Sequence, residues 1–265
     1  MSLLSHGKWH PPGRLREWPM IWALLADVHA NLEALQACME DARERGAGRY
    51  ALLGDLVGYG ADPAAVTEVA MGLTAAGAVS VKGNHDQAVE GSAAYLNDTA
   101  RAAIEWTRSN LEARHRDYLA QLPLIAREDP ICFVHASADA PHKWNYVDGT
   151  AAAARSTQAA ATAFTFCGHV HDQGLYFERP GGGMGAFRPV PGTAIPVGRH
   201  RRWLAIAGSV GQPRDGNPAA AYVTFDDVRE LLTFHRVAYD RESAAAKIER
   251  SGLPVHLAYR VRRGI

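Results

Sequence analysis

The hydrophobic residues of this chain gather in short apolar runs, and a polar cluster directly follows five of them. These runs are too short for helices and are typical of buried strands. They cover residues 22–26, 50–53, 78–81, 131–134 and 164–167. Polar groups at the carboxyl ends of strands can converge although they lie far apart in the sequence. The pattern therefore predicts one site assembled from several loops.

Between the strands of the first half, apolar residues recur with helical spacing. Helices are predicted between Asn31 and Gly46, between Asp62 and Gly77, over 98–122, within 150–162 and over 241–250. Asn31 and Asp62 are favourable N-cap residues, and Pro63 suits a first helical position. Alternating strands and helices give this half an α/β character.

After residue 164 the pattern changes to short strands separated by turn-rich segments. Strands are predicted over 175–178, 203–207, 222–226 and 230–239, mainly in antiparallel sheet. Residues 179–200 are rich in glycine and proline, which predicts a surface excursion with the form of a loose hairpin.

Length and charge set bounds on the class of protein. We expect a single domain over 19–265, because no linker or repeat divides the 265 residues, and a poorly ordered N-terminal extension over 1–18. Lys plus Arg and Asp plus Glu are both 28, so no net charge attracts nucleic acid or an anionic membrane. No apolar run is long enough for a signal peptide or a membrane span, so no membrane partner is expected.

The three cysteines indicate a reducing compartment. Cys38, Cys132 and Cys167 are an odd number, lie in apolar stretches and show no paired spacing. This argues against a disulfide framework and favours a cytoplasmic location.

The clusters after the five runs consist of residue types that bind metals. They are Asp27-x-His29, Gly54-Asp55, Gly83-Asn84-His85-Asp86, His135 and Gly168-His169-x-His171. Each alone is ordinary, because an isolated histidine is more often a core or surface imidazole. Together they supply a carboxylate that can bridge two cations, further oxygen and imidazole donors, and glycines that allow close backbone approach.

In type and order, these clusters resemble the motifs D-x-H, G-D, G-N-H-[DE], H and G-H-x-H of the calcineurin-like metallophosphoesterase superfamily. The likeness is closest to compact bacterial and archaeal members of its phosphodiesterase-like branch. It implies two facing mixed sheets flanked by helices, a four-layer α/β/β/α sandwich. It also implies a dinuclear metal site, whose first cation is held by Asp27, His29, Asp55 and His171, and whose second is held by Asp55, Asn84, His135 and His169.

The expected cofactors are two divalent ions. Carboxylate, amide and imidazole ligands favour manganese, iron, cobalt, nickel or zinc over calcium, without selecting one. The resemblance implies hydrolysis of a small phosphomonoester or phosphodiester by a metal-activated water, and a nucleotide-derived substrate is one option. His85 aligns with a histidine that contacts phosphate and protonates the leaving oxygen, and Asp86 is expected to orient it. Asn84 lies beside His85 and is expected to reach the substrate too.

Residues outside the motifs complete the expected substrate site. Ser209 and Arg214 lie in the glycine-rich segment 208–214, which is expected either to bind phosphate or to form a structural turn. Trp144 and Tyr146 are expected either to stack on a nucleobase or to cover the core edge. The basic run 199–202 has two interpretations, a polyanion contact and a solvated hairpin end.

Other functions fit the sequence less well. The segment 54–60 lacks the arginine of the corresponding motif in Ser/Thr protein phosphatases. A dinucleoside polyphosphate hydrolase is an alternative, although the sequence has no lysine-rich or base-reading motif. A nuclease would need more basic residues, and a scaffold of this fold would be expected to lack ligands that are all present here. The oligomeric state stays open.

Overall fold

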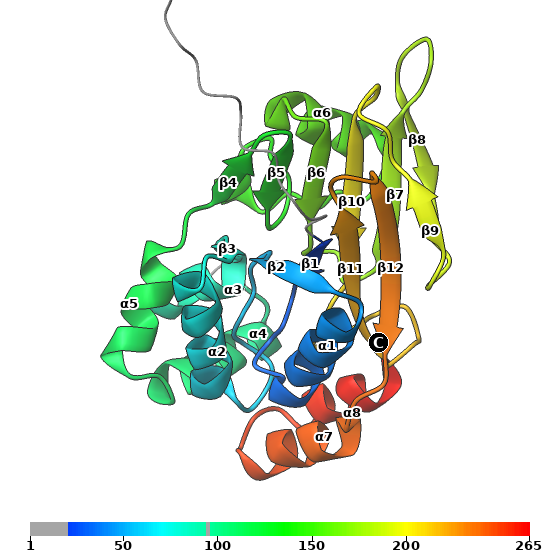
Figure 1. Cartoon of the computed structure of the whole chain (residues 1–265). Coiled ribbons are helices and arrows are strands. Elements are labelled where there is room, and N and C mark those ends of the chain that lie inside the picture. Colours follow the sequence, from blue (N-terminus) through cyan, green and yellow to red (C-terminus); the bar gives the residue numbers. More distant parts are fainter. Residues whose placement is uncertain (1–20, 94–95) are drawn as a thin grey trace, which may run out of the picture.

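The computed structural model describes residues 21–93 and 96–265, which form two mixed six-stranded sheets packed face to face (Figure 1). The expected extension over 1–18 lies outside the described residues. Helices cover the outer face of each sheet, so the expected α/β/β/α sandwich is confirmed.

The first sheet has the strand order β3-β2-β1-β11-β12-β9. Its strands are β1 (Ile21–Leu25), β2 (Ala47–Leu52), β3 (Val79–Ser80), β9 (Ala194–Pro196), β11 (Ala220–Asp226) and β12 (Leu231–Val237). β1, β2 and β3 are parallel, whereas β11 runs antiparallel to β1 and β12 runs antiparallel to β11 and β9. The parallel half directs the carboxyl ends of three strands to one edge.

The second sheet has the strand order β4-β5-β6-β10-β7-β8. Its strands are β4 (Ile125–Glu128), β5 (Ile131–Val134), β6 (Phe164–Cys167), β7 (Gln173–Glu178), β8 (Met184–Phe187) and β10 (Trp203–Ala207). β5, β6 and β10 are parallel, and the other three are antiparallel to their neighbours. The later strands are therefore mainly antiparallel, as expected, apart from the β6–β10 pair.

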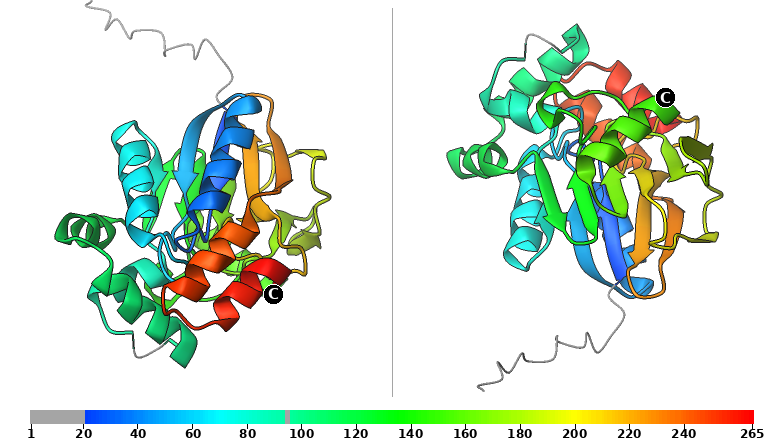
Figure 2. Two further views of the ribbon diagram at one scale, coloured as in Figure 1. Left: turned by 90° about the horizontal axis from the view of Figure 1, so that it is seen from below. Right: turned by 90° about the horizontal axis from the view of Figure 1, so that it is seen from above.

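Eight α-helices and one 3₁₀ helix occur in the described residues. They are α1 (Leu32–Glu44), α2 (Pro63–Ala75), α3 (Asn84–Glu90), α4 (Asp98–Ser109), α5 (Ala113–Gln121), η1 (Pro141–Lys143), α6 (Thr150–Ala160), α7 (Arg241–Arg250) and α8 (His256–Arg263). Figure 2 shows α1, α7 and α8 on one side of the molecule and α6 on the other.

The core forms layers because side chains alternate across each strand. In β1, Leu25 packs towards α1 and α2, whereas Trp22 and Leu24 face the second sheet. Phe133, Phe166 and Phe225 are among the buried residues between the sheets. α6 covers the outer face of the second sheet, where its alanines pack against strand residues such as Leu204 and Ile206. This packing fixes the two sheets against each other.

The helix predicted over 98–122 is wrong in one respect, because it is two helices. α4 ends at Ser109, and its C-cap residue Asn110 donates from Nδ2 to the Trp106 carbonyl. α5 then begins with a capping box in which the Glu112 N–H donates to His115 Nδ1. The break allows α5 to pack against α3 and α2. Apolar spacing did not reveal it because both helices are amphipathic.

Two local predictions also need correction. Asp62 precedes α2 as expected, but it makes no side-chain capping bond, and its carboxylate instead accepts from Lys247 Nζ at 2.9 Å. Residues 179–200 are more than a surface excursion, because they contain β8 and β9, which form one edge of each sheet. Single-strand patterns cannot show that a hairpin-like segment divides between two sheets.

The basic run 199–202 agrees with the solvated interpretation. Arg199 pairs with Glu230 at 2.7 Å, and Arg202 pairs with Glu178 at 2.9 Å. Among residues 21–93 and 96–265, none of the helices has the length and apolar character needed to cross a membrane.

Candidate metal centre

The predicted ligands meet where strands of both sheets end. Loops after β1 and β2 carry Asp27, His29 and Asp55, Asn84 is the first residue of α3 after β3, and loops after β5 and β6 carry His135, His169 and His171. All seven side chains are buried. The structure thus brings together residues that span 27 to 171 in the sequence.

The backbone of these loops is unusual. Asp27, His29, Asp55, His169 and His171 all have φ between 48° and 68°, in the left-handed region that non-glycine residues rarely adopt. Such conformations cost free energy and persist where the surrounding structure imposes them, often at functional sites.

Glycines are needed where the loops approach one another. A Cβ on Gly83 would clash with the Asp55 carboxylate, and a Cβ on Gly168 would clash with the carboxylate of Asp27. The prediction that these glycines permit close approach is confirmed.

One half of the centre contains Asp27, His29 and His171. The Nε2 atoms of the two histidines lie 3.1 Å apart. Asp27 Oδ1 lies 3.3 Å from His171 Nε2 and 3.9 Å from His29 Nε2, and it has no hydrogen-bond partner within the part of the chain that the structure describes. These atoms form a group that fits a metal ion.

The other half contains Asn84, His135 and His169. His135 Nε2 lies 3.2 Å from Asn84 Oδ1 and 3.1 Å from His169 Nδ1. Asp55 lies between the two halves, because its Oδ2 is 3.7 Å from His29 Nε2 and 3.5 Å from His135 Nε2. This is the position expected of a bridging carboxylate.

The hydrogen bonds of the histidines explain why cations fit here. Nδ1 of His29, His135 and His171 lies against the backbone carbonyls of Val57, Leu53 and Gln212, at 3.2, 2.8 and 2.6 Å. Carbonyls only accept, so each Nδ1 donates and each neutral ring presents the Nε2 lone pair to the centre. Nitrogen and carboxylate lone pairs that face one another at these distances repel, and a cation between them removes the repulsion.

The pKa values agree with a site built for cations. Burial is the main cause that lowers the pKa of His135 to about 4 and that of His169 to about 2, so these rings are neutral at pH 7. Burial also raises the pKa of Asp55 to about 7, because the charged carboxylate is poorly solvated. Divalent cations would favour the charged form of the acid and the neutral form of the imidazoles.

His85 is the second residue of α3 and lies beside the proposed ligands. Its backbone N–H donates to Asp55 Oδ1 at 2.8 Å, and its ring packs edge-on against His29 with centroids 4.9 Å apart. Its Nδ1 has no hydrogen-bond partner among the described residues. A ring nitrogen of His85 also lies within 4.8 Å of donor atoms of His29 and Asp55.

The Asp86 carboxylate accepts from three backbone N–H groups. Its Oδ1 accepts from the backbone N–H groups of Leu56 at 2.9 Å and Val57 at 3.3 Å, and its Oδ2 accepts from Gly83 N–H at 2.9 Å. The carboxylate therefore holds the Asp55 loop against the start of α3, rather than orienting the His85 ring.

The expected substrate residues divide into two groups. Ser209 is fully buried, its hydroxyl donates to the Asp27 carbonyl at 2.7 Å, and it accepts from Gln212 N–H, so it shapes the loop and is not open to a substrate. Arg214 lines a cavity of about 280 Å³ together with Asp55 and His171, two of the predicted ligands. Of the two, only Arg214 faces the space in front of the centre.

Trp144 and Tyr146 line the same cavity. The Tyr146 ring stacks on His169 with centroids 4.1 Å apart and is 52% exposed. Trp144 packs edge-on against His135 at 5.9 Å, and its backbone φ is 55°. Both aromatics therefore contact predicted ligand histidines and also form part of the cavity wall.

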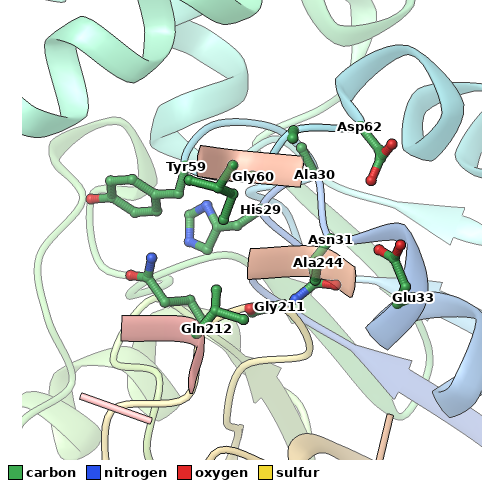
Figure 3. Close-up of a pocket in the computed structure, with 13 residues that line it drawn as sticks. His29, Ala30, Asn31, Glu33, Tyr59, Gly60, Asp62, Gly211, Gln212 and Ala244 are labelled. Atoms are coloured by element: carbon green, nitrogen blue, oxygen red, sulfur yellow. Dashed lines mark hydrogen bonds between the residues drawn. The ribbon is translucent and has the colours of Figure 1, made fainter. Parts of the chain in front are cut away.

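Sequence reasoning missed Lys143, Asn97 and Tyr59, which also line the cavity. Tyr59 stood between Gly58 and Gly60, and this glycine pair was the available signal for a close approach. Figure 3 shows Tyr59 and His29 at a smaller cavity of about 10 Å³, which Gln212 also lines. This second space holds about one water and lies beside His29.

Comparisons with known proteins give the chain's relatives. The model of the calcineurin-like phosphoesterase superfamily domain matches residues 20–228. The uncharacterized protein MJ0912 of Methanocaldococcus jannaschii is 34% identical over 250 residues, which are 90% of this chain and 96% of that protein.

Two solved structures are similar over most of the chain. The crystal structure of a metallophosphoesterase from Sphaerobacter thermophilus is 35% identical, with a TM-score of 0.83, and the match covers 93% of this chain and 100% of that one. The hypothetical protein PH1004 from Pyrococcus horikoshii is 19% identical, with a TM-score of 0.74 and coverage of 93% and 99%, and it supports the fold alone.

Proposed function

The chain belongs to the calcineurin-like phosphoesterase superfamily and is a metal-dependent phosphoester hydrolase, and we propose that it cleaves small phosphomonoesters or phosphodiesters at a dinuclear centre. The observation that carries this proposal is the convergence of lone pairs on two adjoining spaces with Asp55 between them. Phosphoester hydrolysis at a cation pair requires this arrangement of donors.

Seven residues would hold the ions. Asp27, His29 and His171 would bind one cation, Asn84, His135 and His169 would bind the other, and Asp55 would bind both. Two bound divalent cations would activate a water nucleophile and polarise the phosphoryl group. Manganese, iron, cobalt, nickel and zinc all suit this donor set.

The remaining residues act on the substrate. Arg214 would bind phosphoryl oxygens, because its guanidinium is a planar cation that faces the cavity. His85 would donate a proton to the departing oxygen, because it lines the cavity beside Asp55. Asn84 would contribute its amide at the same wall.

A nucleotide-derived substrate is supported by the aromatic wall. Tyr146 has one ring face on His169 and is half exposed, so its other face is open to a planar group. Trp144 lines the same cavity. We therefore propose that an aromatic leaving group stacks on this wall while its phosphate lies at the centre.

The location and organisation are also proposals. Three buried free cysteines support a reducing, cytoplasmic location, because no disulfide stabilises the described residues. Sheets that share one core support a single domain over 19–265. The alternatives of a nuclease and a scaffold have less support, since charge is balanced and the seven proposed ligands lie together.

A substrate panel tests the function. Protein loaded separately with manganese, nickel or zinc is assayed with nitrophenyl monoester, nitrophenyl diester, nucleoside monophosphates, cyclic nucleotides, dinucleoside polyphosphates and single-stranded DNA. We expect hydrolysis of small monoesters or diesters that depends on metal. Hydrolysis of DNA alone would instead support the nuclease, and bound metals without any turnover would support the scaffold.

A further inference from the structure

We propose that Tyr59 is a positioning residue of this site, whose aromatic ring holds the Arg214 guanidinium and the His85 imidazole at the substrate phosphate. The inference rests on the proposed function. It assigns a role to a residue that no motif includes.

The Tyr59 ring lies between two functional histidines. Its centroid is 4.6 Å from that of His29 and 4.5 Å from that of His85, and both contacts are tilted. The Val57 carbonyl also holds His29 Nδ1, whereas His85 Nδ1 has no hydrogen-bond partner among the described residues, so a displaced Tyr59 ring would free mainly the His85 imidazole, the proposed proton donor, to turn. Figure 3 shows the ring beside His29, with its hydroxyl end directed away from Gly60.

The third contact is with Arg214. Its guanidinium carbon lies 5.8 Å from the Tyr59 ring centroid, within the range of cation–π attraction. Its Nη2 donates to Gln212 Oε1 at 3.1 Å. Within residues 21–93 and 96–265, Arg214 forms no ion pair with a carboxylate, although its charge acts on Asp27 and Asp55 at longer range. The Tyr59 ring, its hydroxyl and the Gln212 amide thus hold this cation without neutralising it.

The backbone holds Tyr59 in an unfavourable conformation. Its φ is 65°, which is a rare value for a bulky residue. Neighbouring Gly58 lies against the His85 ring, and Gly60 lies against the His29 carbonyl, so a Cβ at either glycine would clash. The loop therefore passes closely between the two histidine segments, and only the side chain at position 59 can extend from it.

The C-terminal helices support the ring from behind. Tyr59 is 7% exposed and belongs to an apolar cluster with Ala100 of α4, Ala244 of α7 and Leu257 of α8. Lys247 of α7 pairs with Glu33 at 2.6 Å and with Asp62 at 2.9 Å, which ties α7 to the starts of α1 and α2. Strain, three site contacts and this packing together indicate that the ring is positioned for function.

The test compares Tyr59→Leu, which removes the ring, with Tyr59→Phe, which keeps it. Inorganic phosphate binding to metal-loaded protein is measured by calorimetry, with metal content measured separately. We expect Tyr59→Leu to retain metal but to weaken phosphate binding about tenfold, the size of a partly desolvated cation–π contact, and Tyr59→Phe to stay within about threefold of the original protein. Tyr259→Leu, at a 53% exposed tyrosine, is the matched control.

A double-mutant cycle with Arg214→Ala separates positioning from a general structural role. In the Arg214→Ala background, Tyr59→Leu should weaken phosphate binding by less than about twofold. Equal effects in both backgrounds, or an equally large loss in Tyr59→Phe, would overturn the proposal. If Tyr59→Leu does not fold, Tyr59→Asn replaces it, because asparagine tolerates a left-handed backbone.

Activity measurements distinguish a failure of the proposed function from a failure of the proposed role of Tyr59. Original protein that binds metal but hydrolyses no phosphoester refutes the proposed function. Active protein in which Tyr59→Leu leaves both phosphate binding and the KM of nitrophenyl phosphate unchanged refutes the role of Tyr59 alone.

Discussion

Replacement of Asp86 distinguishes a residue that holds loops together from one that acts on His85. Asp86→Ala would leave three buried backbone N–H groups without their acceptor, those of Leu56, Val57 and Gly83. Bonds to a charged group contribute about 1.5 to 3 kcal/mol each, and the bond of 3.3 Å contributes least. We therefore expect a loss of about 3 to 5 kcal/mol in the free energy of unfolding, at the upper end for a single substitution.

Asp86→Asn is the graded variant. Its amide oxygen can still accept from Leu56 and Val57, but its NH₂ group would face the Gly83 N–H. One donor is then left unsatisfied, which costs about 1 to 3 kcal/mol. Asp98→Ala is the matched control, because the Asp98 side chain is 95% exposed and its ion pair with Arg101 should contribute about 0.5 kcal/mol or less.

Urea unfolding measures these differences as shifts in the midpoint at constant slope. Metal content is measured on the same samples, and it should fall with stability because the Asp55 loop is no longer held. The reasoning is refuted if Asp86→Ala loses turnover but keeps its metals and unfolds within about 1 kcal/mol of the original protein. That result would restore the role inferred from the sequence, in which Asp86 acts through His85.

Three further predictions follow from the geometry. His85→Ala should keep its metals and lose most turnover, least for nitrophenyl esters, whose leaving groups need little protonation; metal loss would contradict its role as proton donor. Asp55→Asn should lose at least one bound metal per chain by elemental analysis, and a full metal content would contradict a bridging position. Burial lowers the pKa of His235 in the folded state from 6.5 to about 4. Between these pH values the unfolded state binds a proton that the folded state does not, so the stability that is present above pH 6.5 is lost as the pH falls towards 4. Metal-loaded His235→Gln should show a smaller loss of stability over this range, and identical pH profiles would count against the assignment.

The sequence was sufficient to select the proposed ligands, which the structure brings together, because their chemistry depends on residue type and order. The apolar runs before Asp27, Asp55 and His135 place these residues at strand ends, and the ends of parallel strands converge in this fold. Long-range contacts were harder to predict. Two of the three N–H groups that donate to the Asp86 carboxylate belong to a loop about thirty residues earlier in the chain, and no local sequence pattern indicates such a pairing.

The predictions of where helices begin and end failed where packing against neighbouring elements determines those ends. α3 begins at Asn84 inside a motif interpreted only as ligands, and α8 has no apolar run that stands out from its arginines. The sequence did not indicate Tyr59, because the features that mark it are its left-handed backbone conformation and its contacts with distant parts of the chain. These are properties of the folded structure.

The division of the proposed ligands between the sheets has a consequence for assembly. The first sheet and its loops supply Asp27, His29, Asp55 and Asn84, and the second supplies the remaining three histidines. Each ion would take donors from both sheets, so neither sheet with its loops could supply the full set of ligands for an ion by itself. Metal would then bind only after the two sheets have packed together, and its binding would stabilise their packed arrangement. Removal of metal by a chelator should therefore accelerate the exchange of amide hydrogens at the interface between the sheets.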